Sequence, residues 1–332
     1  MDTTLQTTLQ TTLHSNLHHR IPLPRTLVLL ALFLAFPWGA QALGQEFYIS
    51  MACRLMIFAL AASSLNLILG FGGMVSLGHA AYFGAGAYAV GILMQHGVVS
   101  AWISWPAAML VGGLMALAIG ALCLRTRGIY FIMITLAFAQ MVYYLFISLR
   151  SYGGEDGLNL MSRSSLGVPG VDLSGDTSFY YVVLALLAGC LLLMHRLVNS
   201  RFGRVLQAVR DNETRVAAIG YPVFRYKLTC FAIAGALAGL AGALIANQNM
   251  LVSPSLVHWT QSGSLMVMVI LGGAGYFWGG VLGAFALLVL EEVLAGYTEH
   301  WQLPLGVILL IVVLLLPKGM ASLADRFKGE RK

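Results

Sequence analysis

The position of its few charged residues constrains this 332-residue chain more than any other feature. Hydrophobic residues make up 59% of the sequence and charged residues only 10%, so polar side chains are too few to cover a soluble globule of this size. The basic residues gather in one loop, residues 196–227, between long apolar stretches, and in a tail at 318–332. This placement is typical of loops beside membrane spans and argues against nucleic-acid binding. We therefore predict an all-α, polytopic membrane protein.

A membrane-spanning helix needs about 20 mostly apolar residues. The sequence contains about ten such segments, and because several are short or rich in glycine we expect about 8 to 10 transmembrane helices. Segment 75–95 is either a full span or a re-entrant segment. The segments are 26–43, 48–69, 75–95, 102–124, 128–149, 179–197, 226–246, 260–274, 278–294 and 303–316.

The loops predict an orientation in the membrane. An even number of crossings places both termini on one side, together with Arg125, Arg127, the 196–227 loop and the 318–332 tail. Lys and Arg accumulate in cytoplasmic loops, so this side is predicted to be cytoplasmic. The loop 150–178 falls on the other side and holds more acidic than basic residues. We expect a membrane domain over residues 26–317, with residues 1–25 and 318–332 as polar tails.

The first residues allow two interpretations. They contain the tract TTLQTTLQTTLH, which we interpret as a disordered tail because threonine is a poor helix former and the repeat carries no charge. The alternative is an amphipathic helix built on leucines four residues apart. The stretch that follows, with Arg20, Arg25 and the triplet Ala40-Gln41-Ala42, imitates a cleavable signal peptide, so the retention of residues 1–42 stays open.

No motif of an enzyme occurs in the sequence. It lacks a GxxxxGK[ST] phosphate loop, an HExxH zinc helix and a GxSxG nucleophile elbow. The four cysteines lie in apolar runs without metal-ligand spacing. We therefore expect no catalytic site, metal or cofactor, and if the chain pumps a solute, a partner must supply the energy.

The 196–227 loop contains a pattern of two short helices. Apolar residues at 202, 205, 206 and 209 form one helical stripe, which Arg201, Arg204 and Arg210 flank. A second helix is predicted to start at Asp211 or Asn212 and to stop at Gly220. Two amphipathic helices on a membrane surface form a shape that another protein can grip. The alternative is a solvated loop whose arginines only set the topology.

A second pattern lies in residues 65–93, where Gly70, Gly72 and Gly73 are predicted to break a helix inside the bilayer. Unwound backbone at membrane depth is tolerated where it lines a path or is buried in protein. Candidates for lining a translocation pathway are Asn66, Ser76 and His79. The alternative is close helix packing by Gly and Ala, which we also expect at Gly235 and Gly239 and in residues 271–284.

Together these motifs resemble the permease subunits of bacterial branched-chain amino-acid ABC importers, of the kind called LivM. The similarity spans most of residues 65–320. It is carried by NLILGFGGMVSLGHAAYFGAGAY, RFGRVLQAVRDNETRVAAIGYPVFRYKLTCFAIAGALAGLAGAL, VILGGAGYFWGGVLGA and LPLGVILLIVVLLLPKGM. The resemblance implies that the 196–227 loop docks into an ATP-hydrolysing subunit. The residues it points to are Arg210, Asp211, Glu213, Ala218 and Gly220, beside Arg204 on the flank of the stripe.

The resemblance also implies the rest of the importer. The expected partners are membrane lipid, a second permease of the LivH kind, two cytoplasmic ATPase subunits and a periplasmic solute-binding protein, in a bacterial inner membrane. The expected solutes are leucine, isoleucine and valine, with urea or short-chain amides as the alternative. A carrier driven by an ion gradient would need intramembrane carboxylates, and only Glu291 and Glu292, near one end of a span, are available. An intramembrane enzyme is disfavoured because no paired catalytic constellation occurs.

Overall fold

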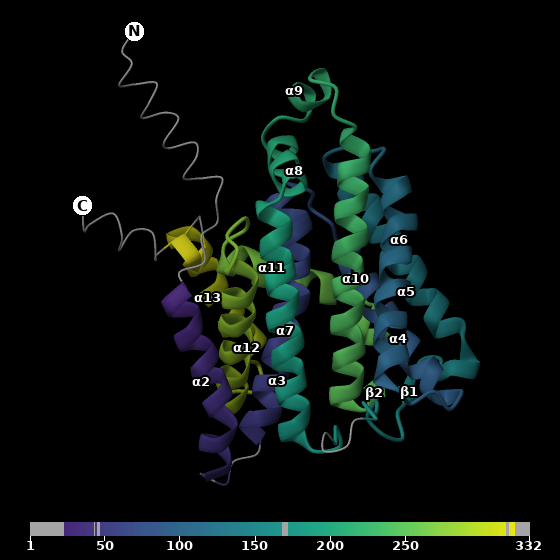
Figure 1. Cartoon of the computed structure of the whole chain (residues 1–332), viewed down its shortest axis with the longest axis vertical. Coiled ribbons are helices and arrows are strands. Elements are labelled where there is room, and N and C mark those ends of the chain that lie inside the picture. The colour runs from purple at the N-terminus through teal and green to yellow at the C-terminus, as the bar shows by residue number, and fades with distance from the viewer. Residues whose placement is uncertain (1–22, 43, 45–46, 168–171, 317–318, 323–332) are drawn as a thin grey trace, which may run out of the picture.

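The computed structural model describes residues 23–42, 44, 47–167, 172–316 and 319–322. The TTLQ repeat and most of the two predicted tails lie outside these residues. The described chain is a bundle of helices that run up and down side by side, with α8 and α9 standing beyond one end of it (Figure 1). Its long helices are α2 (Leu23–Ala42), α3 (Phe47–Asn66), α4 (His79–Gln95), α5 (Ala101–Cys123), α6 (Ile129–Ser148), α7 (Asp176–Asn199), α10 (Val223–Asn249), α11 (Trp259–Gly272), α12 (Gly279–Tyr297) and α13 (Gln302–Leu315).

Shorter elements connect these helices. The helix α3 continues into a π-helix, η1 (Leu67–Phe71), and α8 (Arg201–Asp211) and α9 (Glu213–Ala218) lie between α7 and α10. Two-residue strands, β1 (Leu158–Asn159) and β2 (Leu251–Val252), pair antiparallel with Leu158 opposite Val252. Single 3₁₀ turns are η2 (Arg150–Tyr152), η3 (Pro254–Leu256) and η4 (Met320–Ser322).

The helices confirm the prediction of an all-α polytopic protein. Each of the ten predicted apolar segments overlaps with one of these helices. Within the described residues, six helices are long and apolar enough to cross a membrane: α3 with η1, α5, α6, α7, α10 and α12. The helices α11 and α13 are apolar but shorter. The segment predicted at 75–95 is helical only from His79, because the chain between Gly72 and Gly78 is unwound.

Contacts between distant residues fix the directions of the helices. The Gln41 amide at the end of α2 donates to the Thr177 hydroxyl at the start of α7 (2.8 Å), so these helices are antiparallel. At the other end of the bundle Arg127, between α5 and α6, pairs with Glu213 of α9 (3.5 Å). Gly319, just before η4, packs closely against Gly273, after α11. We call this end of the bundle the α8 end. The start of α2 lies towards this end and η4 lies at it, as an even number of crossings requires.

The centre of the bundle is α10, which packs against α3, α4 and α5. Backbones approach closely here because glycines face one another: a Cβ added to Gly242 would lie 1.8 Å from the Phe83 carbonyl oxygen, and one added to Gly239 would lie 2.4 Å from that of Ala108. Gly235 packs in the same way against Gly112. The predicted close packing at Gly235 and Gly239 is therefore confirmed.

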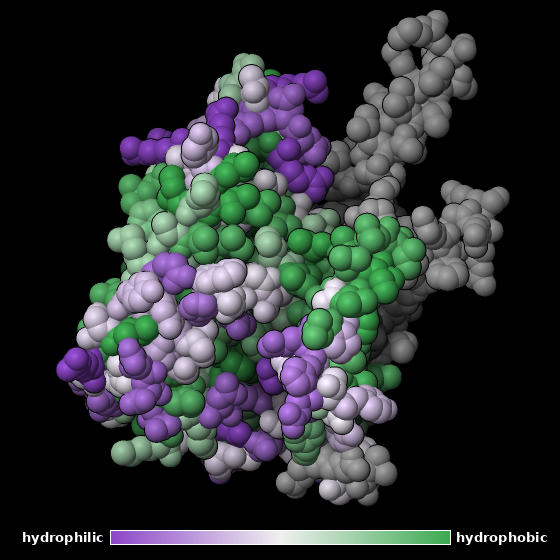
Figure 2. Space-filling view, turned by 180° about the vertical axis from the view of Figure 1, so that it is seen from behind, coloured by the Kyte–Doolittle hydropathy of each residue, from purple (hydrophilic) through white to green (hydrophobic). Residues whose placement is uncertain are grey.

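The outer surface divides into bands. On the face shown in Figure 2, hydrophobic side chains form a band below the hydrophilic tip at the α8 end, and hydrophilic side chains gather in the half of the molecule towards the opposite end. The helix α6 buries only Phe131, Thr135, Ala139 and Phe146, so most of its apolar side chains face outward. A broad exposed apolar band between two polar ends is what a bilayer requires.

Candidate functional site

The helix α8 is amphipathic, as the sequence predicts. Its inward stripe contains Leu206 and Val209, both buried, with Phe202 and Val205 half-buried. The hydroxyl of Ser200 caps the helix by accepting from the Gly203 backbone N–H (3.3 Å). Arg201 and Arg204 are exposed on the other flank, so the stripe holds the helix against the bundle.

The helix α9 also has the predicted limits. Of the two residues proposed to start it, Asn212 is the cap, since its side-chain oxygen accepts from the Arg215 backbone N–H (2.9 Å). The helix ends at Ala218, and Gly220 follows in a left-handed conformation with φ of +94°. Pro222 then starts the turn into α10. The two short helices form one unit, residues 200–222, which we call the α8–α9 element.

Two of the predicted docking residues are engaged within the chain. The Glu213 carboxylate binds the Lys227 ammonium of α10 (2.7 Å) and, more loosely, the Arg127 guanidinium (3.5 Å). Arg210 donates from Nη1 to the carbonyl oxygen of Gly70 (2.6 Å). Its guanidinium therefore points toward the membrane helices. Asp211 is exposed and contacts only its neighbour Arg210 among the described residues (3.5 Å).

The remaining predicted docking residues are exposed at the surface of the element: Arg204 on α8, and Ala218 and Gly220 at the tip. Sequence analysis missed the apolar side chains beside them. Ile219 is 69% exposed, Tyr221 44% and Phe224 41%. The signal was present as the sequence IGYPVF, in which three large apolar residues flank a helix stop. An apolar tip on a polar element has the character of a protein contact.

The predicted break after α3 is present, and Gly72 caps the π-helix that precedes it. The three pathway candidates lie around it, and all three are buried. The amide of Asn66 accepts from the Gly275 backbone N–H (3.0 Å) and donates to the Tyr276 carbonyl oxygen (2.8 Å). The Ser76 hydroxyl accepts from the Gly78 backbone N–H (3.2 Å).

His79, the third candidate, starts α4 and pairs with the Ser64 hydroxyl of α3 (2.8 Å from Nε2). That hydroxyl donates its one proton to the Ala61 carbonyl oxygen, so His79 must be the donor to it through Nε2–H. Its other ring nitrogen, Nδ1, is buried and has no hydrogen-bond partner within the described part of the chain. An unpaired buried acceptor is costly.

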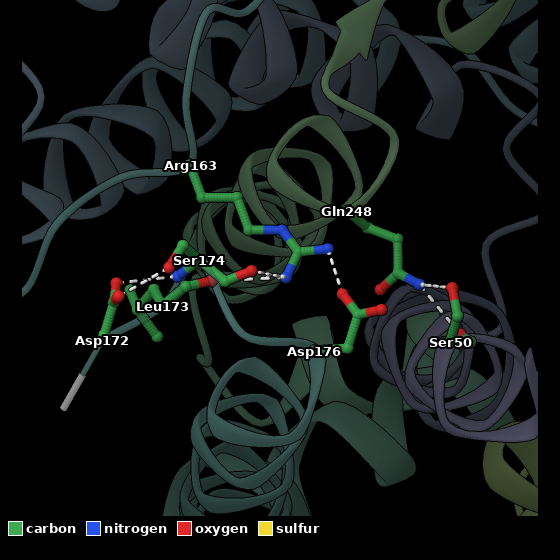
Figure 3. Close-up of polar contacts among 7 residues, drawn as sticks. All are labelled: Ser50, Arg163, Asp172, Leu173, Ser174, Asp176 and Gln248. Carbon is green, nitrogen blue, oxygen red and sulfur yellow. Dashed lines mark hydrogen bonds and ion pairs between the residues drawn. The ribbon is translucent and has the colours of Figure 1, made fainter. Parts of the chain in front are cut away.

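A second polar cluster lies at the opposite end of the bundle (Figure 3). Arg163 binds the Asp176 carboxylate (2.5 Å) and donates to the carbonyl oxygens of Leu173 and Ser174 (3.3 Å each). Asp172 accepts from the backbone N–H (3.0 Å) and the hydroxyl (2.6 Å) of Ser174. These bonds to Ser174, chiefly the one from its hydroxyl, lower the pKa of the Asp172 carboxyl below its ordinary value.

Comparison with known protein families identifies the family of this chain. A family model described as the permease component of branched-chain amino acid transport systems matches residues 47–316. The chain belongs to this family. The match runs from α3 to α13 and so includes both the break after α3 and the α8–α9 element. The resemblance expected from the sequence is confirmed.

Individual relatives agree with the family. The high-affinity branched-chain amino acid transport system permease protein LivM of Escherichia coli (strain K12) is 28% identical over 322 residues, 89% of this chain and 73% of the relative. LivM of Salmonella typhimurium is 27% identical over 318 residues with the same coverage. The corresponding protein LivH of Salmonella typhimurium is 22% identical over 284 residues, 79% of this chain and 90% of the relative. No solved structure gives a significant match.

Proposed function

We propose that this chain is the membrane permease subunit of an ATP-driven importer of branched-chain amino acids. The observation that carries the proposal is the family match over residues 47–316, which joins a polytopic bundle to an amphipathic element at one end. Permeases named LivM and LivH are both similar to it, which supports a second related permease as its partner. The chain has no phosphate-binding loop, so the energy comes from separate ATPase subunits.

The α8–α9 element is the proposed ATPase contact. The element presents the exposed apolar side chains Ile219 and Tyr221, followed by Phe224 at the start of α10, and it also carries the exposed arginines Arg204 and Arg215. An apolar centre with a charged rim is the usual composition of a protein interface. It fits a partner groove that is apolar at its floor and acidic at its edge, and Ala218 and Gly220 leave room for close approach.

Charge supports the orientation. Arg125, Arg127 and the basic residues of the α8–α9 element all lie at the α8 end, so this end is the cytoplasmic one under the positive-inside rule. The 149–175 segment then faces the periplasm of a bacterial inner membrane, where a solute-binding protein delivers the amino acid. The break after α3 is the proposed pathway region, with Asn66, Ser76 and His79 at its wall.

The test is ATP-dependent leucine uptake by vesicles that contain the chain, a second permease, two ATPase subunits and a binding protein. Ile219→Asp places a charge at the apolar tip and is expected to lower both ATPase co-purification and leucine uptake at least tenfold. The matched control is Met161→Asp, which adds the same charge at a fully exposed position of the opposite end and should keep ATPase co-purification. Normal co-purification of Ile219→Asp would refute the docking assignment.

The same vesicles test the solute and the energy source. Uptake of urea without leucine would keep the importer and change its solute. Uptake driven by an ion gradient in the absence of ATP would refute the importer. The orientation is tested in cells by a thiol reagent that does not cross membranes: in a variant without native cysteines, Ser162→Cys should react from outside and Asn212→Cys only after the membrane is opened.

A further inference from the structure

Three glycines form a notch that holds the Arg210 side chain. Its Nη1 donates to the Gly70 carbonyl oxygen at 2.6 Å. A Cβ added to Gly73 would lie 2.6 Å from Arg210 Cγ, and one added to Gly275 would lie 3.0 Å from Arg210 Nη1. A side chain at Gly73 or Gly275 would therefore meet the arginine. The notch therefore fits this one long, flat cation closely.

The Gly70 carbonyl needs such a donor. It belongs to the π-helix at the end of α3, and the last carbonyls of a helix have no partner within the helix. The backbone N–H groups of the unwound chain bond elsewhere, since Gly72 donates to Leu67 (3.1 Å) and Met74 to Ile68 (3.1 Å). The partial negative charge at a helix C-terminus favours a guanidinium there.

The notch also includes the turn between α11 and α12. The Gly275 backbone N–H donates to the Asn66 side chain (3.0 Å), and a Cβ on Gly70 would lie 2.3 Å from the Gly275 nitrogen. The end of α3 and the α11–α12 turn are thus one packed unit, and Arg210 touches both parts of it. Through this unit α8 reaches the chain break that separates α3 from α4.

The other contacts of α8 with the bundle are mostly apolar, apart from a buried hydrogen bond from Gln207 Nε2 to the Val198 carbonyl oxygen of α7, the helix that directly precedes α8 (3.2 Å). Leu206 packs into the main core, and Val209 packs with Val216 and Val223 in a small apolar cluster. Apolar contact is non-directional and lets a helix slide or roll. A hydrogen bond to one carbonyl depends on distance and angle, so it fixes the position of α8 relative to the break.

On these grounds we infer that Arg210 is the positioning residue that transmits movement of the α8–α9 element to the break after α3, and is not itself a contact with the ATPase. The inference rests on the proposed function, since it requires an ATPase bound at the tip. In this arrangement Ile219 and its neighbours receive the movement. Arg210 passes it to the end of α3 and to the α11–α12 turn.

The experiment measures three quantities in the reconstituted complex: ATPase co-purification, ATP hydrolysis, and leucine molecules taken up per ATP hydrolysed. Arg210→Ala is expected to keep co-purification and hydrolysis within about twofold of wild type and to lower uptake per ATP at least tenfold. Arg210→Lys keeps the cation with a single point donor and should recover part of the loss, because lysine cannot match the guanidinium geometry. The matched control, Arg125→Ala, removes an exposed charge at the same end and should leave all three quantities unchanged.

Each possible result either supports or overturns the role inferred for Arg210. Loss of co-purification by Arg210→Ala, like that of Ile219→Asp, would make Arg210 a docking residue and overturn the inference. Uptake per ATP equal to wild type would also overturn it. If Arg210→Ala does not fold, Arg210→Lys decides: a normal ratio overturns the inference and a reduced ratio supports it. Failure of the wild-type complex to bind its ATPase would instead refute the proposed function.

Discussion

Two segments between membrane helices use arginine in opposite ways. The α8–α9 element, residues 200–222, carries four arginines, of which Arg201, Arg204 and Arg215 are exposed without an ion-pair partner among the described residues. The 149–175 segment at the opposite end turns its Arg163 inward, where the side chain is only 10% exposed. The first segment builds helices that project from the bundle (Figure 1), and the second folds back onto it.

The contacts explain the difference. Arg163 lies 4.9 Å over the Phe179 ring of α7, and the next backbone N–H, that of Ser164, donates to the Asn247 side chain of α10 (2.7 Å). The segment thereby clamps α7 to α10. At the α8 end Leu206 packs into the main core and Arg210 and Glu213 bond to the bundle, while Ile219 and Tyr221 at the tip stay exposed. The 149–175 segment is therefore held against the bundle, and we call it the fixed cover. The α8–α9 element is held at its base and exposed at its tip, an arrangement that suits a lever.

The largest expected effect comes from Gly70→Ala, which disturbs the packing at the base of the α8–α9 element. The new Cβ would lie 2.0 Å from the Asn66 side-chain oxygen and 2.3 Å from the Gly275 nitrogen. Backbone must move, at a cost of about 3 kcal/mol, and the midpoint of thermal unfolding in detergent should fall by roughly 5–10 °C. Gly189→Ala in α7, where nothing lies within 4 Å, is the control and should not lower the midpoint. Equal midpoints for the two variants would contradict the close packing.

Arg163→Gln weakens the contacts that hold the fixed cover, the 149–175 segment, in place. The variant loses the ion pair to Asp176 and two bonds to backbone carbonyls, and since Asp176 is 47% exposed we expect a loss of only about 2 kcal/mol. Limited proteolysis should then cut the 149–175 segment faster, while ATPase co-purification stays unchanged. Arg150→Gln, an exposed arginine of the same segment, is the control. If co-purification fell instead, the two ends would be coupled and the contrast between them would fail.

Sequence reasoning succeeded where the signal is local. The stripe of α8, the start of α9 at Asp211 or Asn212 and the Gly220 stop each depend on residues within one or two turns, so spacing predicts them. It failed where the partner is distant in sequence. Arg210 bonds to Gly70, 140 positions away, and Asn66 to Gly275, 209 positions away. An exposed-looking arginine beside an apolar stripe gives no sign of a carbonyl at the end of another helix.

Helix boundaries show the same limit. Residues 75–78 are apolar enough to belong to a span, yet α4 begins only at His79. The Leu77 backbone N–H donates to the Thr135 hydroxyl of α6 (3.3 Å), so a contact with another helix satisfies the unwound chain. Hydropathy measures the preference of a segment for lipid, and it does not contain the hydrogen bonds that let such a segment unwind.

A smaller effect is expected from Glu213→Gln at the start of α9. The substitution removes the charge that pairs with Lys227, a side chain only 15% exposed, and should cost about 1 kcal/mol because Glu213 is itself 30% exposed. The measured quantity is the unfolding midpoint, with Asp211→Asn as the control, since Asp211 is 70% exposed and its pairing is loose (3.5 Å). A larger fall for Asp211→Asn would contradict the assignment of Glu213 as the anchor of α9.

The smallest expected effect is the pH dependence of the fixed cover. The bonds from Ser174 favour the charged form of Asp172, so folding lowers the pKa of this carboxyl. The resulting stabilisation is present above the unfolded-state pKa and is lost as the pH falls through the folded-state pKa. Ser174→Ala removes the hydroxyl bond, which lowers the pKa of Asp172 more than the backbone bond does. The pKa of Asp172 therefore rises in this variant, and the stabilisation is lost at a higher pH.

Digestion of the 149–175 segment by an acid-active protease, measured across the acidic range, reports the shift. Cleavage of Ser174→Ala should begin at a higher pH than cleavage of wild type. Ser162→Ala, an exposed serine of the same segment, should follow wild type. Because Asp172 is fully exposed, solvent screens its charge and the shift must be small. Superimposable profiles for Ser174→Ala and wild type would show that the Asp172–Ser174 pair adds nothing to the stability of the cover.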